Sequence, residues 1–301
     1  MDRLKKAVGA GMVIPVLAIA GCSSGSDRSG NESVREPAIS SFPRVENPKT
    51  LSFPLDKYRL LTDNENRRTV GSALKILRTD CMGRFGFEFH DAEPAAPVEF
   101  NHERLYGVAD QRTARLYGYH NPRGGVAQSK AQSNLTASAE AVLVGEVEAY
   151  KGTDVPKGGC AGDAVRKVHA GSPGMTSADS QLPDRLIAEA SLRAQKDSRV
   201  RKAFKRWSEC MKESGYRYDS PTAVLRDARF AQSPQPAQEE IGTAVADVEC
   251  KSKNNVIGVW STVEVAYQRR LVEDNQLALK KIEDDISMQV KNAYRVVGRE
   301  G

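Results

Sequence analysis

Cysteine is the residue type whose positions in this chain point most directly to chemistry. Of the five cysteines, Cys22 stands alone near the start, and the others are Cys81, Cys160, Cys210 and Cys250. A thiol can be acylated, oxidised to a disulfide or used to bind a metal ion. A metal site built from these four thiols would need close Cys-x-x-Cys pairs, which the sequence lacks. We therefore expect no metal and no cofactor.

The residues before Cys22 have the form of an export signal. Arg3, Lys5 and Lys6 give a positive start, and the apolar stretch 7–20 that follows is shorter than the roughly 20 residues of a membrane-spanning helix. Residues 19–22, Ile-Ala-Gly-Cys, resemble the bacterial lipobox. That resemblance implies cleavage after residue 21 and acyl chains such as palmitate on Cys22. The alternative is a plain signal peptide that happens to end before a cysteine.

A lipid on Cys22 would hold the mature protein at the outer face of the cytoplasmic membrane, where disulfides persist. Residues 22–49 are mostly Ser, Gly, Asn, Glu and Pro. Such a composition buries too little apolar surface to offset its ordering entropy, so it predicts a disordered tether. The chain thus divides into a signal peptide (1–21), a tether (22–49) and a folded part (50–301).

One short pattern occurs twice in the folded part: Cys-Met, then a glycine, then two aromatic residues. It reads Cys81-Met82 with Gly86, Phe87 and Phe89, and again Cys210-Met211 with Gly215, Tyr216 and Tyr218. Each copy follows apolar residues at helical spacing. The glycine fits the left-handed residue that ends a helix in a Schellman cap, in which the next residue contacts the one at C3, here the methionine.

The remaining apolar pattern is also helical. Helices are expected from Thr62 or Asp63 to Cys81, over 109–117, 137–149 and 161–169, from 182 onward, over the following run that ends at Cys210, and over 239–251. From Trp260 to Val297 the pattern predicts one long helix, or two with a bend. No stretch alternates as a strand would, so we predict an all-α or nearly all-α protein. This argues against a two-lobed α/β solute-binding protein.

Four cysteines allow three disulfide connectivities, and sequence alone does not choose among them. The duplicated layout favours Cys81 with Cys160 and Cys210 with Cys250. It divides the folded part into two pseudo-repeats, about 50–172 and 182–301. The whole layout resembles secreted lipoproteins of high-GC Gram-positive bacteria, on the residues Trp207, Cys210-Met211, Gly215-Tyr216, Gly159-Cys160, Cys250-Lys251 and Tyr117-Gly118-Tyr119. The resemblance supports the anchor and the paired cysteines only. It does not point to any particular activity.

The charge of the chain excludes one class of partner. The formal net charge is +5, of which the first six residues contribute +2. The remaining +3 is small and mixed with many acidic residues, so we expect no nucleic acid as partner.

The first Cys-to-Cys interval is longer than the second, and its surplus contains two Leu-Tyr-Gly stretches. Tyrosines beside glycines offer rigid faces for a sugar or a peptide. The candidate contact residues are therefore Tyr106, Tyr117, Tyr119 and His120. The alternative is that these tyrosines close a small core of their own.

Two functions remain open from the sequence. The first is a membrane-anchored helical module without enzymatic activity, which binds an envelope protein or cell-wall glycan through residues 106–120. The second is a hydrolase acting on cell-wall material, with a histidine and a carboxylate as general acid and base. The residues for that chemistry would be His102, His120, Glu103 and Asp110.

Overall fold

The computed structural model describes residues 35–90, 101–121, 135–231 and 235–298. The signal peptide, Cys22 and the tether up to residue 34 lie outside the described residues. The chain divides into two compact units, 1–36 and 37–301.

The described residues are 65% helical and 2% strand, which confirms the predicted fold class. An antiparallel pair, β1 (Ala149–Tyr150) and β2 (Thr153–Asp154), provides the strand residues. The α-helices are α1 (Asn64–Arg84), α2 (Gln111–Tyr117), α3 (Ala137–Val144), α4 (Gly159–Val168), α5 (Ser177–Ser180), α6 (Leu182–Lys196), α7 (Ser198–Glu213), α8 (Pro221–Val224), α9 (Gln238–Lys253), α10 (Val256–Asp274) and α11 (Gln276–Val297). The 3-10 helices are η1 (Pro48–Thr50), η2 (Asp56–Tyr58), η3 (Leu60–Thr62) and η4 (Ala228–Ala231).

The two Cys-Met helices end in the same way. Gly86 and Gly215 have φ angles of +77° and +91°. The N–H of Phe87 donates to the carbonyl of Met82 at 3.2 Å, and that of Tyr216 donates to Met211 at 2.9 Å. With the Gly86-to-Gly83 and Gly215-to-Lys212 bonds, these are Schellman caps. The prediction from the repeated pattern is confirmed.

The disulfides join Cys81 to Cys160 and Cys210 to Cys250, with Cα atoms 5.5 and 5.7 Å apart. This is the connectivity that the duplicated layout favoured. Each bridge ties the last turns of a Cys-Met helix to a later helix, α1 to α4 and α7 to α9. The cysteines of both bridges belong to hydrophobic clusters of the core.

The helix expected from 182 and the run that ends at Cys210 are α6 and α7, and they meet at Asp197. The extended backbone and the carboxylate of Asp197 cap the start of α7. The long C-terminal run breaks at Asn275, whose side-chain amide donates to the carbonyl of Leu271 at 2.7 Å. Of the two possibilities left open by the sequence, two helices with a bend is therefore correct.

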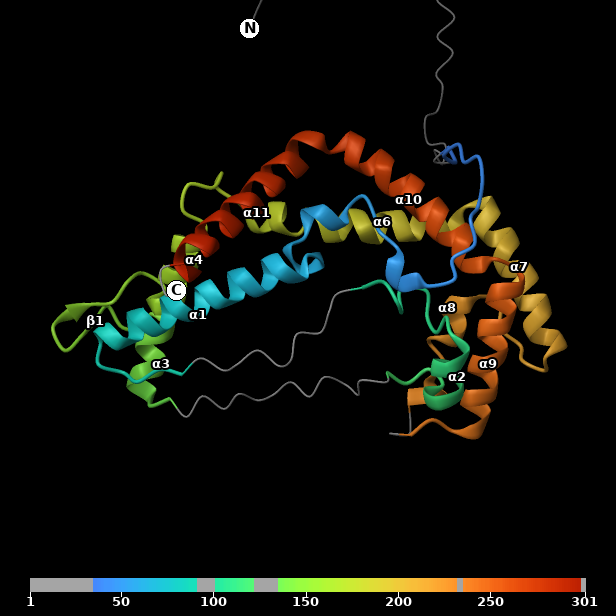
Figure 1. Ribbon diagram of the computed structural model, residues 1–301, viewed down its shortest axis with the longest axis horizontal. Coiled ribbons are helices and arrows are strands. Elements are labelled where there is room, and N and C mark those ends of the chain that lie inside the picture. The colour runs from blue at the N-terminus through green and yellow to red at the C-terminus, as the bar shows by residue number, and fades with distance from the viewer. Residues whose placement is uncertain (1–34, 91–100, 122–134, 232–234, 299–301) are drawn as a thin grey trace, which may run out of the picture. The chain divides into compact units, whose positions relative to one another are not determined.

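Helices from both expected pseudo-repeats pack together. In Figure 1, α11 lies along α1, and α6 lies along α10. The C-terminal helix thus shares a core with α1 and α4, while α2 packs on α9. The two disulfides follow the duplicated layout, but three of the four hydrophobic clusters among the described residues cross the boundary between the repeats.

The folded unit begins at Pro37, earlier than the boundary at residue 50 that composition predicted. Ile39, Phe42 and Val45 pack against the largest hydrophobic cluster. The Asn255 amide donates to the carbonyl of Phe42 at 3.0 Å. A few spaced apolar residues therefore attach 37–49 to the helices, although the average composition of the segment is polar.

The cap glycines give a direct test of the backbone. We expect Gly215→Ala to lower the free energy of unfolding by about 1–2 kcal/mol, because a side chain is disfavoured at positive φ. Gly71→Ala, inside α1 with open space around it, should raise that free energy by about 0.5–1 kcal/mol. Urea unfolding measures both changes. Equal effects of the two substitutions would contradict the cap at Gly215.

Candidate functional site

Residues 101–121, here called the insertion, lie against α9. Asp110 caps α2 by accepting from the N–H of Thr113 at 2.8 Å, and Gly118 ends the helix, as predicted. The Arg104 guanidinium donates to the carbonyl of Tyr119 at 2.7 Å, which joins the two ends of the insertion. The insertion is therefore closed on itself and packed on a helix far away in the sequence.

Tyr106 is buried in the main core, with 2% of its surface exposed. Its ring lies 4.7 Å from that of Trp260, and its hydroxyl donates to the Glu264 carboxylate at 3.0 Å. The Lys251 ammonium donates to the backbone carbonyls of Tyr106 and Val108 at 2.9 and 3.1 Å. The ring of Tyr106 is thus not available to a ligand in this structure, because it fills the core between the insertion and α10.

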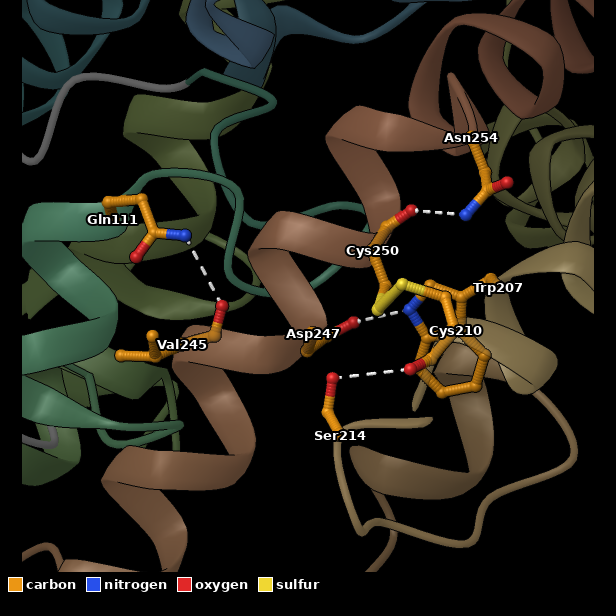
Figure 2. Close-up of a disulfide and its surroundings, with 8 residues drawn as sticks. All are labelled: Gln111, Trp207, Cys210, Ser214, Val245, Asp247, Cys250 and Asn254. Carbon is orange, nitrogen blue, oxygen red and sulfur yellow. Dashed lines mark hydrogen bonds between the residues drawn. A yellow bond between two sulfur atoms is a disulfide. The ribbon is translucent and has the colours of Figure 1, made fainter. Parts of the chain in front are cut away.

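Asp247 is fully buried on α9 and accepts three hydrogen bonds. Its donors are the Trp207 indole at 2.9 Å, the Lys251 ammonium at 2.8 Å and the Tyr119 hydroxyl at 3.1 Å. Figure 2 shows the bond to Trp207 beside the Cys210–Cys250 disulfide. Burial raises the pKa of Asp247, and its three donors oppose that rise. Asp247 therefore links α7, α9 and the insertion.

Glu240, also buried on α9, holds the end of the insertion. One carboxylate oxygen accepts from the N–H of Tyr119 at 2.7 Å and lies 2.8 Å from Nδ1 of His120. A Cβ atom on Gly118 would come within 2.6 Å of the same oxygen. Glycine at 118 therefore allows the Glu240 carboxylate to come this close to the backbone. The neighbouring Tyr117 remains 37% exposed.

The candidate acid and base residues have other contacts. His102 Nε2 lies 2.9 Å from an Asp56 oxygen that also accepts from the N–H of Phe53 at 2.8 Å. Glu103 forms an exposed ion pair with Lys49 at 3.2 Å. Asp110 serves as the cap of α2. The sequence did not reveal the carboxylate partners of His102 and His120, because they lie far away in the chain.

Glu264 is a second buried carboxyl of this region whose pKa is raised. Burial raises its pKa to about 7, against the opposing effects of the Tyr106 hydroxyl, of nearby His102 and of Gln268. Gln268 in turn accepts from the N–H of Leu55 at 3.2 Å. The carboxyl thus joins the start of the folded unit, the insertion and α10. Sequence reasoning missed it because it lies in an ordinary helical pattern.

The exposed apolar residues of this region were also missed. Leu105 and Leu116 each precede a tyrosine of the Leu-Tyr-Gly stretches, and both are exposed. Leu225, exposed as well, lies over the insertion: a Cβ atom on Gly107 would be 3.1 Å from it. The repeated Leu-Tyr-Gly was a signal for these positions, but it did not show which of the two side chains would face solvent.

A groove of about 470 Å³ lies along one side of α7, next to its buried face. It combines basic and acidic side chains over one aromatic ring, and its lining residues are Arg201, Phe204, Lys205, Ser208, Glu209 and Asp219. None of the sequence-predicted site residues lines it. Within the described ranges, three or more His, Cys, Asp or Glu side chains are nowhere grouped as metal ligands.

The described helices include none with the length and apolar character to cross a bilayer. No family model, curated protein or solved structure matches the chain.

Replacement of Glu264 should change how stability depends on pH. The pKa of Glu264 is about 7 in the folded protein, against an ordinary value of 4.5. Between pH 4.5 and pH 7 the folded protein therefore binds a proton at this carboxyl that the unfolded protein has lost. This group's contribution to stability is complete below pH 4.5 and is lost as pH rises to about 7. We expect Glu264→Gln to remove this loss and to raise the free energy of unfolding at pH 8 by about 1–3 kcal/mol.

Glu273→Gln, an exposed position on the same helix, is the matched control. Chemical denaturation of the two variants and the wild type at pH 4.5 and pH 8 measures the effect. The same pH dependence in Glu264→Gln and in the wild type would show that Glu264 is not held neutral by burial.

Proposed function

We propose that this protein is a lipid-anchored, extracytoplasmic helical binding protein without enzymatic activity. The insertion would be its contact surface, and an envelope protein or a cell-wall glycan its partner. The supporting observation is that buried charged residues fix the insertion in place, while its leucine and tyrosine side chains at 105, 116 and 117 remain exposed.

The anchor part of the proposal depends on the N-terminal sequence. The positive start, the short apolar stretch and the lipobox-like residues 19–22 are together typical of an exported lipoprotein. The two disulfides agree with an oxidising compartment, since such bridges are rare in the cytosol of most organisms. The proposed location is the outer face of the cell membrane.

The contact surface differs from the one that sequence reasoning favoured. Tyr106 and Tyr119 hold the insertion to α9 and α10, so their part in binding would be indirect. Leu116 and Tyr117 are adjacent on α2 and are 54% and 37% exposed. A helix that displays a leucine and a tyrosine on a fixed support presents apolar area with little conformational entropy to lose on binding.

The alternative is an enzyme acting on cell-wall material through a histidine and a carboxylate. In two pairs, His102 with Asp56 and His120 with Glu240, the ring nitrogen and the carboxylate oxygen are close enough for proton transfer, which favours the enzyme. In each pair, however, the same carboxylate oxygen accepts a backbone N–H and so stabilises a turn. A structural role explains both pairs, and we therefore rank the enzyme second.

The anchor can be tested by metabolic labelling with a fatty acid. We expect Cys22→Ser to abolish incorporation of label and to leave the precursor uncleaved, since acylation would precede cleavage. Cys81→Ser is the matched control, because Cys81 lies in a disulfide and should not affect labelling. Continued labelling of Cys22→Ser would remove the anchor from the proposal.

The contact surface can be tested by site-specific photocrosslinking in intact cell envelopes. A photoreactive amino acid in place of Tyr117 should give a discrete adduct, and the same group in place of exposed Tyr294 on α11 should not. Protease or glycan-hydrolase digestion of the adduct distinguishes a protein from a glycan partner. Leu116→Ser should lower the yield at least fivefold without loss of stability. Equal yields from both positions would contradict the assignment of the insertion.

A further inference from the structure

The positive charge of the protein is concentrated on one helix. Residues 196–219 contain eight Lys and Arg against four Asp and Glu, a net charge of +4. The chain after the proposed cleavage site has a net charge of +3, so the rest of it carries −1. The totals alone suggested that positive and negative charges are mixed throughout the chain. The positive charge is instead concentrated in this segment.

Four of these basic residues form a stripe on α7: Arg201, Lys202, Lys205 and Arg206. All four are exposed, on the side opposite the buried residues of α7. In the part of the chain that the structure describes, none of the four has an ion pair or a side-chain hydrogen bond. Glu209 and Asp219 share the groove with Arg201 and Lys205, at the C-terminal side of the stripe.

The stripe is unfavourable for the helix that carries it. The pairs 201/205 and 202/206 place like charges one turn apart, which destabilises a helix. Arg201 ends the first turn of α7, and a positive charge near the N-terminus of a helix opposes the helix dipole. The one acidic residue at this end, Asp197, is bonded to Arg199 at 2.7 Å. Helix stability therefore does not explain the stripe, and an external anion would.

The stripe lies close to where the chain enters the folded unit. The Arg199 guanidinium donates to the carbonyl of Pro37 at 2.8 Å, which attaches the first residue of the unit to the first turn of α7. Residues 23–36 separate this point from Cys22. A peptide of that length spans at most about 50 Å. A lipid on Cys22 would hold α7 within that distance of the membrane.

We propose that the basic stripe of α7 docks on the anionic phospholipid headgroups of the membrane that carries the Cys22 lipid. This inference rests on the proposed lipid anchor for its choice of surface. Charge complementarity and the entry of the chain beside α7 favour lipid phosphates over a more distant polyanion. The docked helix would fix the orientation of the unit on the membrane.

The test uses the mature chain from residue 23, without lipid, and vesicles of phosphatidylglycerol or of phosphatidylcholine alone. Each Lys or Arg near an anionic surface improves partitioning roughly fivefold. We expect cosedimentation with phosphatidylglycerol vesicles only, weakened by salt through screening. The variant with Arg201→Gln, Lys202→Gln, Lys205→Gln and Arg206→Gln should bind roughly 600-fold less.

The matched control removes four exposed positive charges from other helices: Arg68→Gln, Arg112→Gln, Arg115→Gln and Lys291→Gln. This control should bind vesicles within about fivefold of the wild type. The stripe variant should have an equal or higher Tm, which separates lost docking from lost folding. Equal binding by the two variants, binding to phosphatidylcholine, or no binding by the wild type would overturn the proposal. Tighter binding to soluble poly(glycerol phosphate) than to vesicles would also overturn it and assign the stripe to a wall polymer. The vesicle measurements use protein without lipid, so their outcome does not depend on whether Cys22 is labelled with a fatty acid. Failure of the docking proposal and failure of the anchor proposal can therefore be told apart.

Discussion

The ion pair between Asp247 and Lys251 is the interaction on which the insertion and its surroundings depend. Both side chains are buried on α9, one turn apart. Figure 2 shows Asp247 beside the Cys210–Cys250 disulfide. Lys251 uses its other protons for the carbonyls of Tyr106 and Val108, and Asp247 accepts from Trp207 and Tyr119. Loss of either partner would leave a buried charge uncompensated, at a cost of about 3–5 kcal/mol.

This arrangement explains how a segment with little core of its own can be ordered. A short helix such as α2 is not stable alone in water. Here the residues on either side of it are fixed by charge-assisted bonds to α9: Glu240 accepts from the N–H of Tyr119, and Lys251 donates to the carbonyls of Tyr106 and Val108. Because buried polar groups are costly unless all their bonds are made, such a network permits one placement of the insertion and disfavours others. A fixed placement is what a contact surface at Leu116 and Tyr117 would require.

The two proposed surfaces have different physical character. The insertion offers exposed apolar side chains on a rigid support, whereas α7 offers a stripe of four exposed basic side chains close to where the chain enters the unit. Long-range electrostatics suit a flat anionic membrane, and apolar area suits a specific partner. The α7 helix contributes to both, since its buried Trp207 contacts the network and its opposite side carries the stripe.

The sequence by itself determined the local structure. Glycine at 86 and 215, with Met and an aromatic residue at fixed distances, specifies a helix end, because that geometry is set within six residues. Asp63, Asp110 and Gly118 marked further helix ends for the same reason. The order of the cysteines favoured the disulfides that the structure contains.

Only the tertiary structure decided which tyrosines are buried, and that 37–49 belongs to the folded unit. The partners of Tyr106 and Tyr119 are Glu264 and Asp247, more than a hundred residues away. Periodicity shows that a helix has an apolar face, but it does not show which other segment covers that face. Burial is a property of the whole packed chain, so no local pattern could separate Tyr106 in the core from Tyr117 at the surface.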